Sequence, residues 1–216
     1  MVLCIVCIMV LFAVLVLVYT HLFYNPFKDK NVIVVGNSKE LLDDEMGSVI
    51  DGYDMIIRLN HFKIEGYEKY TGTRTDGIHM NYILTPREVI HNVLDTNTIK
   101  WMGTRDKSRF CSKVGMSRFD KRVFQYDTKT LPCRSPTSGT AVLADIMKYC
   151  NRPVTIIGVG GYSEPGYYYK ETQKVLDHNW KNSQDRHCLE VEKVFLDNLI
   201  ESGKVRKLGR RQSNIK

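Results

Sequence analysis

The sequence predicts an α/β fold in which a parallel β-sheet is covered by helices on both faces. Short runs of β-branched and apolar residues alternate with helical patterns along the chain, and strands that are apolar throughout are typical of parallel sheets. The chain has 216 residues, of which 43% are hydrophobic and 25% are charged. These values fit one folded domain of ordinary size, with or without an additional terminal segment.

The expected strands and helices follow one another in a regular order. The first strand is NVIVVG, which ends at Gly36, and the second is DMIIRL. Parallel sheets bind ligands beyond the carboxyl ends of their strands, so the residues that follow each strand are candidates for binding. The strands are expected over residues 31–36, 54–59, 77–82, 98–102, 122–126, 154–157 and 205–208, with helices over 138–149 and 189–202.

The first twenty residues have a different character from the rest. Residues 2–19 are apolar almost throughout and carry no charge, and a run of this length can span a bilayer as a helix. A cleaved signal peptide would need a basic start and a small-residue cleavage site, and neither is found. We expect a transmembrane signal-anchor over 1–20, a juxtamembrane linker over 21–30, a catalytic domain over 31–208 and a basic tail over 209–216.

Charge and cysteine content exclude several classes of function. The net charge is +7, but six basic residues and no acidic residue follow Gly203, so overall basicity does not indicate a nucleic-acid partner. The four cysteines outside the apolar run lack C-x-x-C spacing, and no D-x-D motif occurs. We therefore expect no metal site. The positive residues that flank the apolar run, Lys28 and Lys30, favour a cytosolic domain.

Polar residues and glycines follow three of the predicted strands. In the segment Gly36–Ser38, backbone amides could meet a phosphate at a helix N-terminus, with Asn37 binding a ribose or phosphate and Ser38 capping the helix. An ordinary strand-to-helix turn is the alternative. Asn60 ends the second strand, and the glycine-rich segment 158–161 follows a later one. Neither glycine segment matches the G-x-G-x-x-G dinucleotide motif.

Two helix starts and one aromatic run are further candidates. Thr137, Ser138 and Gly139 open a predicted helix with a hydroxyl-rich cap that suits an anion or serves as a plain cap. His187 and Glu192 lie at the start of the last helix, where the helix dipole disfavours imidazolium and so keeps the ring neutral, as a general base requires. A surface histidine is the alternative. The phenols of 167–169 could donate to a leaving phosphate or simply pack.

Together these segments resemble a known family. VVGNS at 34–38, DGYDMIIRLN at 51–60 and TGTRTD at 71–76 are similar to the long donor-binding motif of the sialyltransferases, glycosyltransferase family 29. The short, third and final motifs of that family resemble the segments at 135–162, YYYKE at 167–171 and HCLEVE at 187–192. All four occur in the family's order.

The resemblance implies a fold and a reaction. The fold would be a single Rossmann-like domain of variant GT-A type, and the reaction an inverting transfer of sialic acid from CMP-sialic acid, without a metal or other cofactor, to a glycan hydroxyl. His187 would be the base, with Glu192 and Tyr168 completing the catalytic set. The implied donor-binding residues are Asn37, Ser38, Asn60, Thr137, Ser138, Gly139 and Tyr167.

The resemblance also implies a cellular location, while other donors and other functions remain possible interpretations of the sequence. It implies a type II protein of the Golgi membrane that glycosylates a glycoprotein or glycolipid, an orientation opposite to the one that the flanking charges favour. CMP-Kdo remains an alternative donor. A nucleotide-binding oxidoreductase and an inactive, bilayer-anchored CMP-binding module remain alternative functions.

Three of the four motifs depart from the family pattern. The long-motif cysteine of the family falls at Val32, so Cys150 loses its partner. The short motif reads Pro-Thr-Ser-Gly instead of Pro-Ser-Thr-Gly, and the third motif begins with Tyr167 instead of His.

Overall fold

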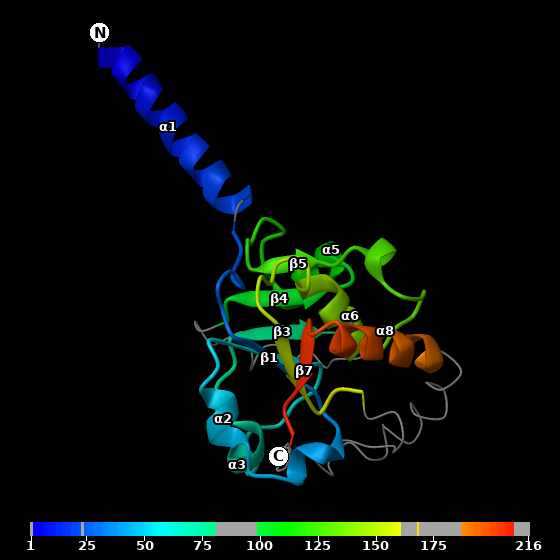
Figure 1. Cartoon of the computed structure of the whole chain (residues 1–216). Helices are drawn as coiled ribbons and strands as arrows, with labels where there is room; N and C mark the ends of the chain where they lie inside the picture. Colours follow the sequence, from blue (N-terminus) through cyan, green and yellow to red (C-terminus); the bar gives the residue numbers. More distant parts are fainter. Residues whose placement is uncertain (1, 23, 81–98, 161–167, 169–186, 210–216) are drawn as a thin grey trace.

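The predicted α/β fold with a parallel sheet is confirmed by a computed structural model, which describes residues 2–22, 24–80, 99–160, 168 and 187–209. Within these residues, seven strands pair in parallel in one sheet (Figure 1). The strands are β1 (Val32–Val35), β2 (Met55–Leu59), β3 (Gly77–Met80), β4 (Trp101–Thr104), β5 (Val123–Gln125), β6 (Val154–Ile157) and β7 (Val205–Lys207).

The strand order creates a reversal point beside β1. The sheet runs β5-β4-β3-β2-β1-β6-β7, so the chain moves outward from β1 to β5 and then returns to the other side of β1. Ile33 pairs with Ile56 of β2 and with Thr155 of β6. In open parallel sheets the ligand crevice lies at such a reversal, beyond the carboxyl ends of the strands. The loops after β1, β2 and β6 therefore frame the candidate site.

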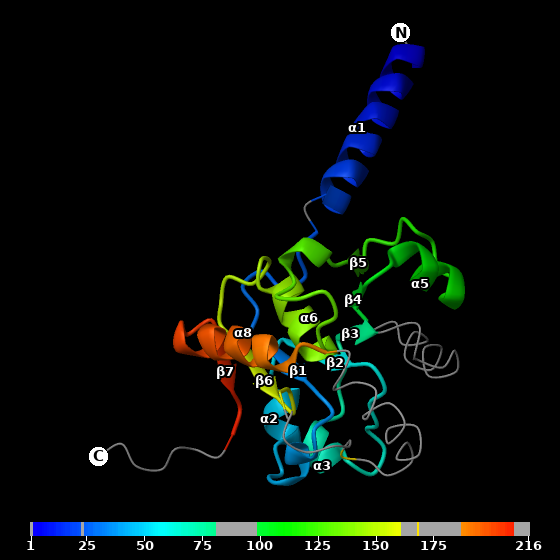
Figure 2. The same cartoon turned by 90° about the vertical axis from the view of Figure 1, so that its right-hand side faces the viewer.

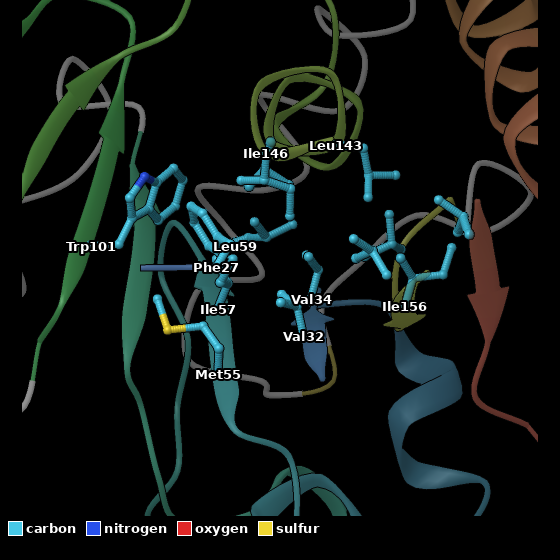
Figure 3. Packing of buried hydrophobic residues seen from close by; sticks show 14 of the residues in the cluster. Phe27, Val32, Val34, Met55, Ile57, Leu59, Trp101, Leu143, Ile146 and Ile156 are labelled. Atoms are coloured by element: carbon cyan, nitrogen blue, oxygen red, sulfur yellow. The ribbon is translucent and has the colours of Figure 1, made fainter. Parts of the chain in front are cut away.

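Two helices cover one face of the sheet. These are α6 (Ser138–Ile146) and α8 (Leu189–Glu201). Leu143 and Ile146 of α6 point toward Val34 and Ile57 of the sheet, and all four side chains are almost fully buried (Figure 3). The apolar face that the sequence predicts for the helix over 138–149 is thus the face that packs on the sheet. The helix ends earlier than predicted, at Ile146. The backbone N–H groups of Tyr149 and Cys150 then donate to the Ile146 carbonyl in a turn.

Shorter elements cover the opposite face. The predicted helix after β1 is a four-residue 3-10 helix, η1 (Lys39–Leu42), followed by α2 (Gly47–Asp51) and α3 (Glu68–Thr71). Leu41 and Ile50 pack there on Ile33, Val35 and Ile56. Farther along the same face, α5 (Lys107–Val114) packs Phe110 on Ile78 and Met102. The result is a sheet with helices on both faces.

The N-terminal helix α1 (Val2–Leu22) projects away from this body (Figures 1 and 2). Its described side chains, residues 5–16, are exposed. Among the described residues, no helix meets the combined length and hydropathy of a membrane span. The predicted anchor therefore stays a prediction.

Part of the segment expected to be a linker contacts the sheet and its loops, from Tyr24 onward. The Tyr24 hydroxyl donates to the Lys100 carbonyl at 2.8 Å, and the Asn25 side-chain amide donates to the Tyr149 carbonyl at 3.0 Å. Phe27 is 0% exposed and packs edge-on against Trp101, with ring centroids 5.5 Å apart. The physical reason is that the Phe27 ring belongs to the core cluster that also contains Trp101 and Ile146 of α6.

Candidate functional site

The loops after β1 and β6 contact each other directly. The backbone N–H of Gly36 donates to Ile157 at 2.8 Å and that of Ser38 donates to Gly158 at 3.2 Å. A Cβ atom at Gly36 would collide with the carbonyl of Gly158. The amides of residues 36 and 38, which the sequence suggested for phosphate binding, thus serve the neighbouring loop. Ser38 caps η1 as predicted, because its hydroxyl accepts the N–H of Glu40 at 3.4 Å.

Asn37 lies at the centre of the crevice framework. Its side-chain amide nitrogen donates to the carbonyls of Leu59 and His61, at 2.9 and 2.8 Å, and so ties the loop after β1 to the loop after β2. The side chain is only 8% exposed, and its Oδ1 atom is buried with no hydrogen-bond partner among the described residues. A buried acceptor without a donor is costly, so this oxygen is suited to a ligand N–H or hydroxyl.

Asn60 joins the loop after β2 to the start of α6. Its φ of 48° lies in the left-handed region, which asparagine tolerates better than most residues. The backbone N–H donates to His79 at 2.8 Å, and the side-chain amide donates to the Ser138 hydroxyl at 2.8 Å. The structure therefore brings Asn37, Asn60 and Ser138, three of the predicted donor-binding residues, to one end of the sheet.

The start of α6 holds an anion, but the anion is the chain's own Glu192. Both carboxylate oxygens accept the backbone N–H of Thr137 at 3.0 Å. One of them also accepts the hydroxyls of Thr137 and Thr140, each at 2.6 Å. A carboxylate is favoured there because the helix N-terminus carries partial positive charge. Glu192 is 0% exposed, so the groups of Thr137 that were expected to face a donor face Glu192.

Gly139 serves close packing. A Cβ atom at this position would lie 2.7 Å from Cγ1 of Val159, the residue after Gly158 in the β6 loop. The glycine lets α6 approach that loop closely. Its predicted role as a donor contact stays a prediction.

The ring of His187 has a defined orientation. Its Nδ1 atom lies 2.8 Å from the backbone carbonyl oxygen of Ser135. A carbonyl oxygen only accepts, so Nδ1 carries the proton, and in the neutral ring Nε2 keeps its lone pair. His187 is half-buried and lies just before α8, whose N-cap is Cys188. This is the tautomer that a general base needs.

A disulfide that the sequence analysis did not predict lies beside this histidine. Cys133 and Cys188 are bonded, with Cα atoms 6.5 Å apart and 55 positions between them in the sequence. No spacing rule identifies such a pair. The expectation that Cys150 lacks its family partner is confirmed, since Cys150 has a free thiol, and burial raises the pKa of this thiol to about 12.

Tyr168 is placed differently from its predicted role at the leaving phosphate. Its side chain is 4% exposed. Its hydroxyl accepts the N–H of Lys63 at 2.8 Å and donates to the carbonyl of the same residue. Burial raises the pKa of this phenol to about 12. The ring therefore holds the loop after β2 in place, while Tyr167, the adjacent predicted donor residue, lies outside the described residues.

Arg58 is a buried cation that the sequence analysis did not single out. It is 0% exposed. It donates to Thr75 Oγ1 at 2.9 Å and to the carbonyl of Thr71 at 2.8 Å. Burial lowers the pKa of this guanidinium to about 10. Arg58 thereby fixes the TGTRTD segment against β2, which explains why these two parts of the long motif occur together.

One group of described residues has the spacing of metal ligands. It comprises Cys133, Cys188 and Glu192, whose ligand atoms lie within 4.8 Å of one another. The two sulfurs are bonded to each other, and the carboxylate already accepts hydrogen bonds from Thr137 and Thr140. This group consequently does not fit a metal ion.

Comparison with known proteins confirms the resemblance that the motifs indicate. Residues 24–103 match the family model of glycosyltransferase family 29 (sialyltransferase). A mouse type 2 lactosamine alpha-2,3-sialyltransferase is 46% identical over 46 residues, which cover 21% of this chain and 14% of that protein. A beta-1,6-galactosyltransferase of Arabidopsis thaliana is also 46% identical, over 43 residues that cover 20% of this chain and 11% of the relative.

A solved structure supports the same fold. The crystal structure of a mammalian sialyltransferase aligns with a TM-score of 0.59 and 17% identity, over 83% of this chain and 68% of the other. At this identity the likeness concerns the fold. The sequence matches to the curated relatives span about one seventh of those proteins or less.

Proposed function

We propose that this chain is a glycosyltransferase that transfers sialic acid from CMP-sialic acid to a hydroxyl group of a glycan, with His187 as the general base. The observation that carries the proposal is the contact between His187 and Ser135. Because the 2.8 Å contact to a carbonyl fixes the proton on Nδ1, Nε2 is left to take a proton from an acceptor hydroxyl. The identity of the donor, CMP-sialic acid, is inferred from the family resemblance.

The transfer needs little more than positioning and one base. In CMP-sialic acid the sugar is already attached to a phosphate leaving group, and the acceptor hydroxyl becomes a better nucleophile as its proton moves to Nε2. The proton finishes on the imidazole, the new glycosidic bond forms at the anomeric carbon, and CMP departs. We propose that this transfer requires no divalent metal, since the one described group with ligand spacing is occupied.

The nucleotide is proposed to bind at the crevice beside β1. The Oδ1 atom of Asn37 is buried and lacks a donor, and it lies on the loop that joins the β1 and β2 ends. Asn60 and Ser138 form the adjacent wall through their 2.8 Å contact. Polar atoms at this reversal point are where a nucleotide is expected in such a sheet.

Glu192 and Tyr168 have proposed roles as positioning residues. Both side chains are buried and their polar atoms bind the chain's own backbone and hydroxyl groups. Glu192 fixes the start of α6 against α8, and Tyr168 fixes the loop that follows β2. They therefore shape the site through other residues instead of touching the substrate.

The sugar specificity is the least constrained part of the proposal. The similar segment is shared by proteins named for sialic acid transfer and by one named for galactose transfer. The decisive experiment is a donor screen that measures nucleotide release with CMP-sialic acid, CMP-Kdo, UDP-sugars and GDP-sugars, with and without EDTA. Release of CMP only from CMP-sialic acid, unchanged by EDTA, supports the proposal. Turnover of a UDP-sugar alone, or no turnover despite CMP binding, contradicts it.

We further propose that α1 anchors the domain on the lumenal side of the Golgi membrane. The Cys133–Cys188 disulfide supports an oxidising compartment, although Lys28 and Lys30 favour the opposite orientation. Protease protection in sealed vesicles tests this placement. A lumenal domain is protected until detergent is added, and digestion without detergent would contradict the proposal.

A further inference from the structure

We propose that the Cys133–Cys188 disulfide is a positioning device for His187 and that breaking it switches the transferase off. The inference rests on the proposed function, because it concerns the base of that reaction. His187 directly precedes Cys188, and Ser135, whose carbonyl orients the ring, lies two residues after Cys133. The disulfide thus joins the two short segments that must stay together for the ring to keep its tautomer.

The helix starts of α6 and α8 are held together by more contacts than the 133–135 and 187–188 segments are. The Glu192 carboxylate binds the start of α6 from within the first turn of α8, so the two helix starts stay together without the disulfide. The 133–135 segment lies outside α6, and Cys133 and Ser135 are both half-buried. Among the described contacts, the disulfide and the Ser135–His187 hydrogen bond are the two that join the 133–135 segment to the 187–188 segment.

Reduction should therefore loosen the ring and leave the fold in place. A dithiol reductant supplies two electrons and two protons, the sulfur–sulfur bond becomes two thiols, and the reductant closes to its own disulfide. Ser135 and His187 then depend on one partly buried hydrogen bond to stay together. The nucleotide crevice is built by Asn37, Asn60 and Ser138, which are independent of that bond.

The test separates the base from the nucleotide site. Titration of the folded wild-type protein with dithiothreitol should lower kcat by about 10- to 100-fold, because a base displaced by about 1 Å loses that much, and should change the Kd for CMP less than twofold. Reoxidation should restore kcat. Cys133→Ser and Cys188→Ser should match the reduced wild type and lose their response to dithiothreitol. Cys150→Ser, which removes a free thiol, should respond like wild type.

A spectroscopic measurement makes the result independent of turnover. In protein labelled with 15N-histidine, the His187 ring should show the Nδ1-protonated tautomer when oxidised and a mixture of tautomers when reduced, with His187→Asn identifying the signal. If this change occurs but no donor is turned over, the positioning inference stands and the proposed function fails. An unchanged tautomer and kcat on reduction would overturn the inference. So would equal losses of kcat and CMP affinity, which indicate general unfolding, or retention of stoichiometric zinc in place of a disulfide.

Discussion

The carboxylate of Glu192 accepts the backbone N–H of Thr137 with both oxygens, at 3.0 Å each. This pair links the first turn of α8, where Glu192 is 0% exposed, to the partly buried start of α6. The family-like motif of a histidine and a glutamate five positions later thus has two separate functions in this fold. The histidine is the proposed base, and the glutamate holds the start of α6.

The first prediction concerns the stability of this link. Glu192→Ala should lower the free energy of unfolding by about 3–5 kcal/mol, because buried donors of Thr137 and Thr140 lose their acceptor. Chemical denaturation measures the change. Glu190→Ala, on the exposed side of the same helix, is the control and should change stability by about 0.5 kcal/mol or less. Equal effects of the two substitutions would show that the buried carboxylate contributes no more to the free energy of unfolding than an exposed one.

The second prediction concerns the proposed base. His187→Ala should lower kcat by roughly 10²–10⁴-fold, the usual contribution of a positioned base, with the Kd for CMP nearly unchanged. His187→Asn is the sharper variant, since its amide nitrogen can replace Nδ1 in donating to Ser135 but cannot replace Nε2. We expect it to melt like wild type and to be as inactive as the alanine variant. A nearly active Asn variant would remove His187 from the mechanism.

The third prediction concerns the wall of the nucleotide crevice. Asn60→Gly and Ser138→Ala each remove one partner of the 2.8 Å contact, and each should weaken CMP binding by about 1 kcal/mol. Asn60→Ala should weaken binding equally and also destabilise the fold by about 1 kcal/mol more than Asn60→Gly, because alanine is strained at φ 48°. Calorimetric titration and thermal melting separate the two effects. Normal CMP affinity in all three variants would exclude this wall from the site.

The fourth prediction is a pH dependence of stability that arises in the core. His79 is 2% exposed and stacks between Tyr126 and Trp101. Burial lowers the pKa of this ring from 6.5 to about 4. The unfolded chain then binds the proton more readily, so the stabilisation is complete above pH 6.5 and is lost as the pH falls toward 4. The total loss approaches about 3 kcal/mol.

His79→Phe tests this assignment. The substitution keeps an aromatic ring in the stack and removes the titrating group. Denaturation at several pH values should show a shallower decline between pH 6.5 and 4 in the variant. Parallel curves for the two proteins would mean that another group causes the decline.

The fifth prediction concerns the N-terminal boundary of the domain. Phe27→Ala should cost about 3–5 kcal/mol, since the ring is 0% exposed. Phe119→Ala is the control, because that ring is 81% exposed and its loss should be nearly neutral. A truncated protein that begins at Tyr24 should fold, and one that begins at Asn31 should be strongly destabilised. Equal melting of the two truncated proteins would contradict the docking of this segment.

The sequence predicts the centre of the sheet well, because β1, β2 and β6 are short apolar runs followed by Gly36, Asn60 and Gly158. Asn37, Asn60 and Ser138 follow from their positions at strand ends and a helix start, and the structure brings them together. The role of Glu192 does not follow from the sequence, because a glutamate in the first turn of a helix is usually exposed. Its burial depends on Thr137, which lies 55 residues earlier in the chain.

The missed features all depend on distant contacts. The disulfide joins residues 55 positions apart, and local spacing gives no signal for such a pair. Phe27 follows Pro26 in a segment without helical or strand periodicity, so its burial depends on the position of Trp101 in β4. Tyr168 lies in an aromatic run whose members are equivalent by pattern, and only the backbone of Lys63 distinguishes it.

The docking of the segment after α1 also determines how far the domain can reach. α1 ends at Leu22, and Tyr24 already donates to Lys100 beside β4, so one residue separates the helix from the folded body. Tyr24 contacts the residue just before β4, whereas the candidate site lies beyond the carboxyl end of β1, three strands away in the sheet. Under the proposed function, the reach of the domain toward its acceptor is therefore set by the position of α1.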